Sequence, residues 1–137
     1  MEKINNTKLI KFPTFTDERG TVSIAEASKT VPFKIERTFH TYDVPEGSLR
    51  GKHAHKQNEQ VYACLKGRVA VTLDDGFNKS EIVLENPQEA IYVGPFVWCT
   101  IKFLEPGTVF IVWNSRCYEE EDYIKNYEEF LKIAKNR

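Results

Sequence analysis

The sequence lacks several features that mark large classes of protein. It has no long apolar run, and the N-terminal stretch MEKINNTKLIKF has no apolar core, so we expect neither a signal peptide nor a membrane anchor. The formal net charge is only -1, which gives no overall field to attract nucleic acid or an acidic membrane. The three cysteines are odd in number and have no C-x-x-C spacing, which favours a reduced, cytoplasmic protein with buried thiols.

The composition is that of an ordinary globular protein. Hydrophobic residues make up 41% of the chain and charged residues 28%, which separates it from disordered sequences. A chain of 137 residues fits one domain with one core. No internal repeat, low-complexity tract or linker interrupts it, so we expect a single domain over residues 1–137.

Most of the chain has patterns typical of β-strands. The segments GTVSIAE and RVAVTLDDG alternate apolar and polar residues, as strands with one buried face do. The segments AIYVGPFVWCTIKFL and GTVFIVWN are rich in β-branched and aromatic residues. Asp75-Gly76 predicts a tight turn between two strands. Many short strands separated by turns favour a sandwich or a rolled barrel, which we place at about residues 8–117.

The last part of the chain has a different pattern. Acidic residues occupy its start and basic residues its end, which matches the dipole of a helix. We therefore expect a helix at about residues 119–135, packed on the sheet or on a second subunit. Apolar residues form a helical stripe along it, at Tyr123, Ile124, Tyr127, Phe130, Leu131 and Ala134.

The segment RGKHAHKQNEQ, residues 50–60, contains two of the three histidines. On a strand, His53 and His55 would project to the same face, because residues two apart share a side. Arg50 and Glu59 are close by, so this face is polar within a mostly apolar protein. A polar inner face on a closed sheet is typical of a pocket. A solvent-exposed edge with two unrelated histidines is the plainer alternative.

The pattern H-x-H-x-x-x-E, formed by His53, His55 and Glu59, is also the first half of a metal motif of cupins, which are small β-barrel proteins. Such sites usually take a further histidine from a later strand, and no histidine follows residue 55. Cys99 lies in the matching region and could complete a mixed site that suits zinc. Without the last ligand we favour histidines that transfer protons, and we expect no metal and no cofactor.

Five segments in order give a more specific indication: RGKHAHK, EQVYACLKG, LDDG, YVGPFVWC and YEEEDYIKNYEEF. Together they resemble the dTDP-4-keto-6-deoxyglucose 3,4-ketoisomerases, cupin-fold sugar isomerases related more distantly to the dTDP-sugar 3,5-epimerases. The resemblance runs from about residue 17 to residue 130. It implies an all-β jelly-roll barrel with a C-terminal helix, a homodimer whose subunits contribute strands to each other, and a metal-free pocket for a dTDP-linked keto sugar.

The reaction implied by this resemblance moves the ketone of a 6-deoxyhexose from C4 to C3, in the biosynthesis of 3-amino-3,6-dideoxy sugars for glycans. The C4 carbonyl acidifies the C3 proton, and a base that removes this proton leaves an enediol or enediolate. Imidazole titrates near neutral pH and suits such work. We expect His55 to be the carbon base and His53 to relay the proton between the oxygens or to orient the sugar. The sequence leaves the reverse assignment open.

The diphosphate of such a substrate needs cationic donors, for which arginine is well suited. By the resemblance, Arg37 and Arg50 occupy positions of nucleotide-binding arginines, and Arg19 lies in a segment that approaches the sugar. Cys99 stands where relatives carry histidine or arginine and is expected to face the sugar. Protonating one or the other face of the enediol gives the gluco or the galacto product, and the sequence leaves both open. His40 either adds a third imidazole to the pocket or points outward.

Three other functions stay open. A 3,5-epimerase of the same fold would use similar carbanion chemistry, but the His–Asp arrangement and tyrosine acid of those enzymes are not found in the sequence. A non-catalytic cupin would bind a small ligand without turnover. A metal-dependent cupin, such as a dioxygenase, would need a bound metal ion.

Overall fold

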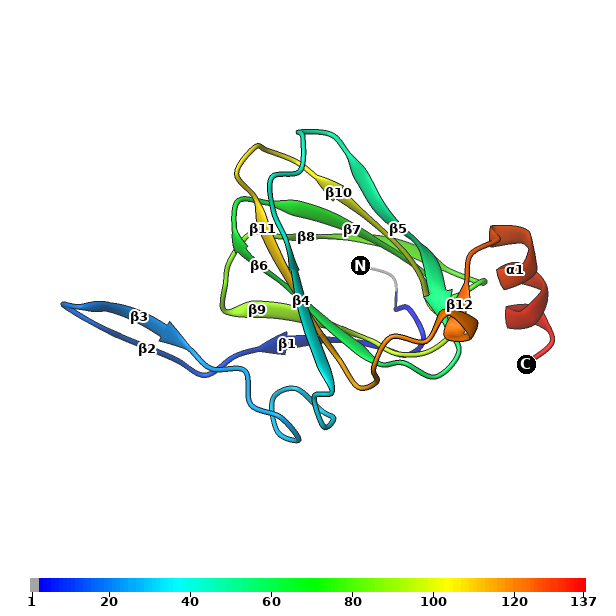
Figure 1. Cartoon of the computed structure of the whole chain (residues 1–137), viewed down its shortest axis with the longest axis horizontal. Helices are drawn as coiled ribbons and strands as arrows, with labels where there is room; N and C mark the ends of the chain where they lie inside the picture. Colours follow the sequence, from blue (N-terminus) through cyan, green and yellow to red (C-terminus); the bar gives the residue numbers. More distant parts are fainter. Residues whose placement is uncertain (1–2) are drawn as a thin grey trace.

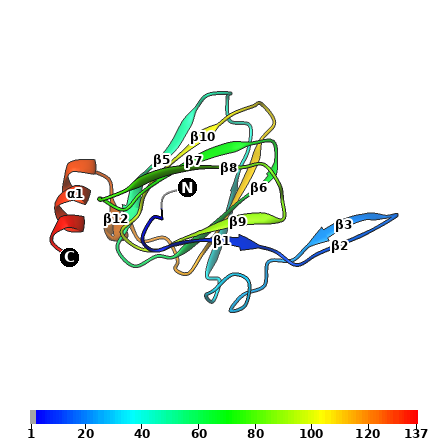
Figure 2. The ribbon, with the colours of Figure 1, turned by 180° about the vertical axis from the view of Figure 1, so that it is seen from behind.

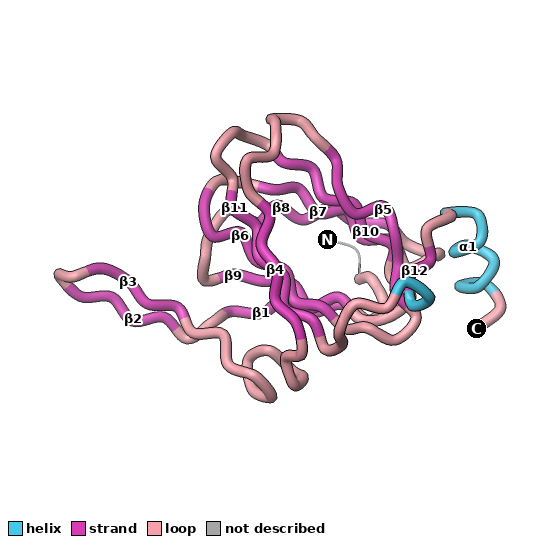
Figure 3. The backbone as a smooth tube through the Cα atoms, in the orientation of Figure 1, coloured by secondary structure: helices cyan, strands magenta, loops and turns pink. Residues whose placement is uncertain are grey.

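The fold of the chain, taken from a computed structural model that describes residues 3–137, is built from two five-stranded antiparallel sheets that face each other (Figure 1). A two-stranded hairpin and a short C-terminal helix lie outside the two sheets. Figure 3 shows that strands dominate the structure and that helix is confined to the C-terminal part. The prediction of an all-β jelly roll with a C-terminal helix is confirmed, with the barrel formed by two separate sheets. No helix within residues 3–137 is long and apolar enough to cross a membrane.

The strands of the first sheet, in spatial order, are β1 (Thr7–Lys11), β9 (Glu89–Val93), β6 (Gln60–Lys66), β11 (Val109–Asn114) and β4 (Arg37–Thr41). Those of the second are β12 (Tyr123–Ile124), β5 (Leu49–His55), β10 (Trp98–Phe103), β7 (Val69–Asp74) and β8 (Lys79–Leu84). The hairpin consists of β2 (Thr14–Asp17) and β3 (Gly20–Ser23). The 3-10 turn η1 (Glu120–Asp122) and the helix α1 (Tyr127–Lys135) complete the chain.

The main core lies between the two sheets. On β7, Val69, Val71 and Leu73 are fully buried and face this core, as the segment RVAVTLDDG predicts. The opposite face of β7 is not the exposed one that was expected, because Ala70 and Asp74 are buried too and only Thr72 is half-buried. Phe103 of β10 and Val112 of β11 face the same core. Burying side chains of this size stabilises the fold by roughly 1.5–3 kcal/mol each, so the sheets are held together by apolar burial.

A second apolar cluster covers the outer face of the first sheet. Phe12, Val31 and Phe33 pack there on Val61 and Ala63 of β6. The segment between β3 and β4, which contains no strand, supplies two of these side chains. β6 is therefore buried on both faces, which explains why its sequence is apolar without a clear alternation.

The β2–β3 hairpin projects away from the two sheets, and α1 lies at the opposite end of the molecule (Figures 1 and 2). Phe15 and Val22 are cross-strand partners in this hairpin. Their exposed fractions are 65% and 60%. The hairpin thus presents an apolar surface that nothing within residues 3–137 covers.

The helix predicted at about residues 119–135 begins later in the structure, at Tyr127. Tyr123 and Ile124 form β12 and pair with β5 instead. The physical reason is the position of the N-cap: the side chain of Asn126 accepts the N–H of Glu129 at 2.9 Å and fixes the first turn there. Asp122, which matched a helix start in the sequence, bonds to residues 55–58 instead.

α1 packs on the second sheet through Phe130 and Ala134, which are buried against Ala54 and Trp98. At the turn after β7, Gly76 has φ +92 and lies directly against Ala134. A Cβ added to Gly76 would be 2.5 Å from the Cβ of Ala134, so only glycine fits this contact.

Replacing Gly76 by alanine should displace α1. The control is Gly107→Ala, because Gly107 also has positive φ (+78) but open space around it. Both variants carry the cost of a left-handed alanine, and Gly76→Ala should lose about 1–3 kcal/mol more stability through the steric clash. Urea denaturation followed by tryptophan fluorescence measures the difference. Equal losses would contradict a tight contact between the turn and α1.

Candidate active site

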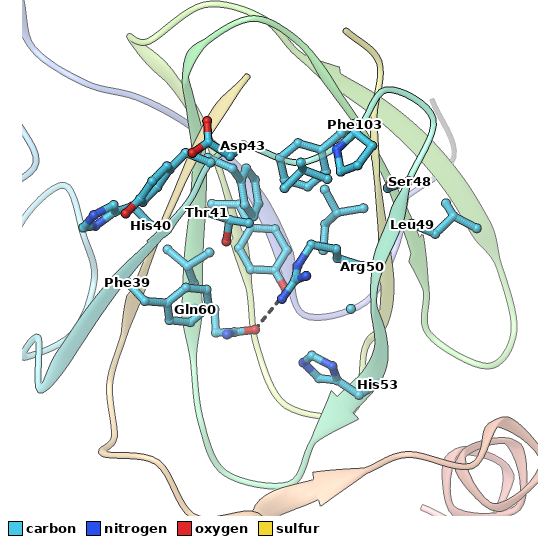
Figure 4. A pocket seen from close by; sticks show the side chains of 18 residues that line it. Phe39, His40, Thr41, Asp43, Ser48, Leu49, Arg50, His53, Gln60 and Phe103 are labelled. Carbon is cyan, nitrogen blue, oxygen red and sulfur yellow. Dashed lines mark hydrogen bonds between the residues drawn. The ribbon is translucent and has the colours of Figure 1, made fainter. Parts of the chain in front are cut away.

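A cavity of about 780 Å³ opens between the two sheets. Its walls come from β4, β5, β6, β10 and β11 and from the loop between β4 and β5. Figure 4 shows the side chains of Arg50, Gln60 and His53 turned toward the same part of this cavity. Apolar side chains, among them Ile101 and Phe103, line the remainder. A largely apolar cavity with a few convergent polar groups is the usual form of a small-molecule site.

The histidines His53 and His55 project to the same face of β5, as the sequence predicted. Their rings are 4.9 Å apart and nearly perpendicular. The ring of Tyr123, on the neighbouring β12, is 4.9 Å from His53 and 4.4 Å from His55. His53 lines the cavity, whereas His55 lies behind it with an exposed fraction of 5%.

The carboxylate of Asp122 orients His55. Its Oδ2 is 3.0 Å from Nδ1 of His55 and also accepts the backbone N–H of Asn58, and its Oδ1 accepts the backbone N–H of Gln57. An ionised carboxylate can only accept, so Nδ1 carries the proton and Nε2 keeps its lone pair. Nε2 is buried and has no hydrogen-bond partner within residues 3–137. It is therefore a buried hydrogen-bond acceptor that the described part of the chain leaves unsatisfied.

Both imidazoles are neutral at pH 7. Burial lowers the pKa of His55 to about 4, with a further contribution from His53, while the hydrogen bond and charge of Asp122 oppose the shift. Burial also lowers the pKa of His53 from its ordinary value. Neutral imidazoles accept protons, so this pair is in the state that a base requires.

The H-x-H-x-x-x-E pattern does not gather its three side chains. Glu59 points to the outer face of the first sheet, where it accepts a hydrogen bond from the hydroxyl of Tyr92 at 2.7 Å. Among residues 3–137, no three His, Cys, Asp or Glu side chains are placed as a group of metal ligands.

The three arginines expected to bind substrate lie in different places. Arg50 lines the cavity, and none of the ion pairs formed within the described part of the chain involves it. Arg37 lies outside the cavity lining, with its guanidinium over the rings of Phe39 and Tyr118. Arg19 is at the tip of the hairpin, where its side chain is 84% exposed and pairs with a neighbouring aspartate.

Cys99 of β10 is the cross-strand partner of His53, whereas His40 lies apart from the histidine pair. Cys99 is buried in the main core, with 1% of its surface exposed, and is not among the residues that line the cavity. His40 is at the cavity rim, where its ring stacks on that of Tyr42 at 5.6 Å. Figure 4 shows it pointing away from Arg50, Gln60 and His53.

Two residues beside the histidines, Asp122 and Tyr123, were not predicted from the sequence. The statement that no His–Asp arrangement is present is wrong, because His55 and Asp122 form one across 67 positions of sequence. Nothing in the sequence distinguishes Asp122 from Glu119, Glu120 and the other acids around it. Only the pairing of β12 with β5 brings this carboxylate to the site.

Comparison with protein families gives a match over nearly the whole chain. The model of the FdtA family, described as WxcM-like, C-terminal, matches residues 5–135. The chain belongs to the FdtA family.

The relatives of this FdtA-family chain are sugar isomerases. A TDP-4-oxo-6-deoxy-alpha-D-glucose-3,4-oxoisomerase from Aneurinibacillus thermoaerophilus is 42% identical over 129 residues, 93% of each chain. The crystal structure of QdtA, a sugar 3,4-ketoisomerase from Thermoanaerobacterium thermosaccharolyticum in complex with TDP, has a TM-score of 0.95 at 35% identity, over 98% of both chains. An epimerase from Mycobacterium tuberculosis has a TM-score of 0.77 at 16% identity, over 90% of this chain and 70% of its own, and shares the fold alone. These comparisons confirm the predicted family, fold and enzyme class, a nucleotide-sugar 3,4-ketoisomerase.

The buried state of His55 predicts a pH dependence of stability. Its folded-state pKa of about 4 lies below the ordinary 6.5, so the unfolded chain takes up the proton first as the pH falls. The free energy of unfolding should therefore be highest above pH 6.5 and fall by about 1–3 kcal/mol between pH 6.5 and pH 4.

Urea denaturation at a series of pH values measures this loss. His55→Asn is the control, because asparagine keeps a donor for Asp122 but does not titrate. The variant should lose less stability than the wild type over the same window. Parallel curves would contradict a buried, neutral His55.

Proposed function

We propose that the chain converts a TDP-4-keto-6-deoxyhexose to its 3-keto isomer through an enediol or enediolate, with His53 and His55 as the proton-transfer groups. The observation that carries the proposal is the pair of neutral, edge-on imidazoles, with His53 at the cavity and His55 behind it. The buried Nε2 of His55 has no hydrogen-bond partner within residues 3–137. The named activity of the 42% identical relative supports the reaction. A 34% identical QdtA variant, crystallised with TDP-4-keto-6-deoxyglucose, supports the substrate.

Burial suggests how the two histidines divide the work. The sequence favoured His55 as the carbon base, but it is His53 that lines the cavity. We assign to His53 the removal of the C3 proton and its return to C4. A buried acceptor without a partner is costly, and a sugar hydroxyl that reaches past His53 would satisfy Nε2 of His55. His55 would then move the proton between O3 and O4.

Arg50 is the side chain that we assign to the diphosphate. Its guanidinium faces the cavity (Figure 4) and its charge is not neutralised by any carboxylate of residues 3–137. Guanidinium binds diphosphate oxygens through paired, charge-assisted hydrogen bonds. Arg37 adds positive charge beside the histidines, where it lowers the pKa of His55 as a minor contribution after burial.

Solvent exchange at carbon separates the roles of the two histidines. In deuterated buffer, His53→Asn should abolish both exchange of the C3 proton and movement of the ketone, because no enediolate forms. His55→Asn should still exchange the C3 proton but form the 3-keto product at least about 100-fold more slowly, since only the oxygen-to-oxygen transfer is lost. Proton NMR reads both processes.

His40→Asn, at the cavity rim, is the matched control and should keep wild-type exchange and turnover. TDP binding by calorimetry should change little in all three variants. If His55→Asn loses exchange of the C3 proton and His53→Asn keeps it, His55 is the carbon base instead. Full activity of both pocket variants would contradict the proposal.

The His55–Asp122 pair is the one feature that favours a 3,5-epimerase as a second candidate, since those enzymes use a His–Asp arrangement. Such an enzyme would exchange the protons at C3 and C5 of the same substrate and leave the ketone at C4. The position of the ketone in the product therefore distinguishes the two.

We also propose that two copies of the chain form a dimer through the β2–β3 hairpin. An isolated two-stranded hairpin is marginally stable in water, and the exposed Phe15 and Val22 need a surface to pack on. An apolar groove of about 350 Å³ on the outer face of the first sheet, which includes Leu65 and Trp113, lies at the base of the hairpin. Exchange of the hairpins would carry Arg19 from one copy toward the cavity of the other.

Mixed dimers test this exchange. Co-expression of Arg19→Ala with His53→Asn should give more activity than either variant alone, because a mixed dimer has one site with both residues intact. If half of the dimers are mixed, about a quarter of the wild-type activity returns. Activity no higher than that of the separate variants would show that Arg19 serves its own subunit or no site. A monomeric mass by light scattering would contradict the dimer itself.

A further inference from the structure

The strand β5 contains a bulge immediately before His53. The pairing of β5 with β10 places His53 opposite Cys99. The next residue of β10, Thr100, lies opposite Gly51, so Lys52 is an extra residue on β5 at this point. The backbone is left-handed at both residues before His53, with φ +88 at Gly51 and φ +61 at Lys52. Among residues 3–137, Lys52 is the only residue other than glycine that has a positive φ inside a strand.

The bulge determines which side chains of β5 share a face. Arg50 and His53 are three positions apart, and in a regular strand such residues point to opposite faces. Their partners on β10, Ile101 and Cys99, are two positions apart and both face the main core. Directly opposite residues of an antiparallel pair project to the same side, so Arg50 and His53 both line the cavity (Figure 4). A regular pairing continued from His53 would instead place Arg50 opposite Lys102, which is exposed on the outer face.

The bulge also brings the backbone of Gly51 to the ring of His53. Burial lowers the pKa of His53, and a hydrogen bond with the backbone of Gly51 opposes this shift. A hydrogen bond that favours the protonated imidazole is one that the ring donates, so the backbone of Gly51 orients the ring of His53. Only glycine fits here, because an added Cβ would lie 3.0 Å from the carbonyl oxygen of Cys99 and 3.0 Å from Cδ1 of Ile101.

Lys52 contributes to the bulge through its backbone. Its side chain is exposed and takes part in none of the ion pairs formed within residues 3–137. Left-handed backbone is unfavourable for residues other than glycine, asparagine and aspartate. Backbone strain of this kind persists only where the surrounding structure holds it, and it is concentrated at functional sites.

We propose that Gly51 and Lys52 are positioning residues of the reaction, whose left-handed backbone places the diphosphate-binding arginine and the proton-abstracting histidine on one wall of the cavity. The inference rests on the proposed function, which assigns these roles to Arg50 and His53. His53 is held by its pairing with Cys99 beyond the bulge, so loss of the bulge would turn Arg50 to the outer face and remove the backbone of Gly51 from the ring. One backbone feature thus serves both substrate binding and proton removal.

The variants Lys52→Val and Lys52→Asn separate the conformation of this residue from its charge. Both remove the ammonium group, but asparagine tolerates left-handed backbone and β-branched valine does not. Calorimetry of TDP binding reports on Arg50, and exchange of the C3 proton of TDP-4-keto-6-deoxyglucose in deuterated buffer reports on His53. Lys52→Val should weaken TDP binding by roughly tenfold to hundredfold and slow the exchange by roughly tenfold or more. Lys52→Asn should match the wild type in both.

Arg50→Ala identifies the origin of the binding loss. In the wild-type background this substitution should also weaken TDP binding by roughly tenfold to hundredfold. In the Lys52→Val background it should add less than about threefold, because the guanidinium already faces away from the cavity. A full additional loss in that background would show that Arg50 still reaches the ligand without the bulge, and would contradict the inference.

Gly51→Ala is the second variant, which tests the same bulge if Lys52→Val does not fold. Its control is Gly107→Ala, because both variants carry a left-handed alanine and Gly107 lies in open space far along the chain from the site. Gly51→Ala should weaken TDP binding and slow the exchange, and Gly107→Ala should keep both at the wild-type level.

Wild-type binding and exchange in folded but less stable Lys52→Val and Gly51→Ala would show that the bulge is a structural feature only, and would overturn the inference. Equal losses in Lys52→Val and Lys52→Asn would assign the effect to the lysine charge and overturn it as well. Loss of only one of the two properties would contradict a shared positioning role. Absence of exchange in the wild type would contradict the proposed function, whereas the TDP measurements would still test the position of Arg50.

Discussion

The carboxylate of Asp122 is the group on which the arrangement of the site depends. It accepts the N–H groups of Gln57 and Asn58 and the imidazole of His55, and so joins the end of β5 to the segment that enters α1. Each hydrogen bond to a buried charge contributes roughly 1.5–3 kcal/mol, so this one side chain fixes a whole corner of the fold. The same contacts set the tautomer of His55 and leave its Nε2 open. The local fold and the tautomer of His55 therefore both depend on the carboxylate of Asp122.

A second group of buried hydrogen bonds lies on the first sheet and connects to those of Asp122. Asn114, which is fully buried, accepts hydrogen bonds from Asn58, Gln60 and Arg37. Asn58 belongs to both systems, because its backbone N–H binds Asp122 and its side chain binds Asn114. The position of the histidines and the polarity of the opposite cavity wall are therefore set by one connected network. Such a network is stable inside an apolar core only because nearly all of its members are satisfied.

Sequence patterns were sufficient wherever the information is local. The core-facing side of β7 and the common face of His53 and His55 follow from the period of a strand, and five ordered segments identified the family. Patterns failed where a contact depends on chain topology. Asp122 is one of four consecutive acids in sequence, and only the antiparallel pairing of β12 with β5 singles it out. The helix begins later than predicted for the same reason, because β12 occupies residues that were expected in its first turns.

The most direct measurement of the central claim is proton NMR of TDP-4-keto-6-deoxyglucose incubated with the wild-type protein in deuterated buffer. A pair of neutral imidazoles that acts across C3 and C4 predicts a product with its ketone at C3 and an unexchanged proton at C5. Exchange at C3 and C5 with the ketone still at C4 would contradict this account and identify an epimerase. A substrate that binds but remains unchanged would show that the cavity is a binding site alone.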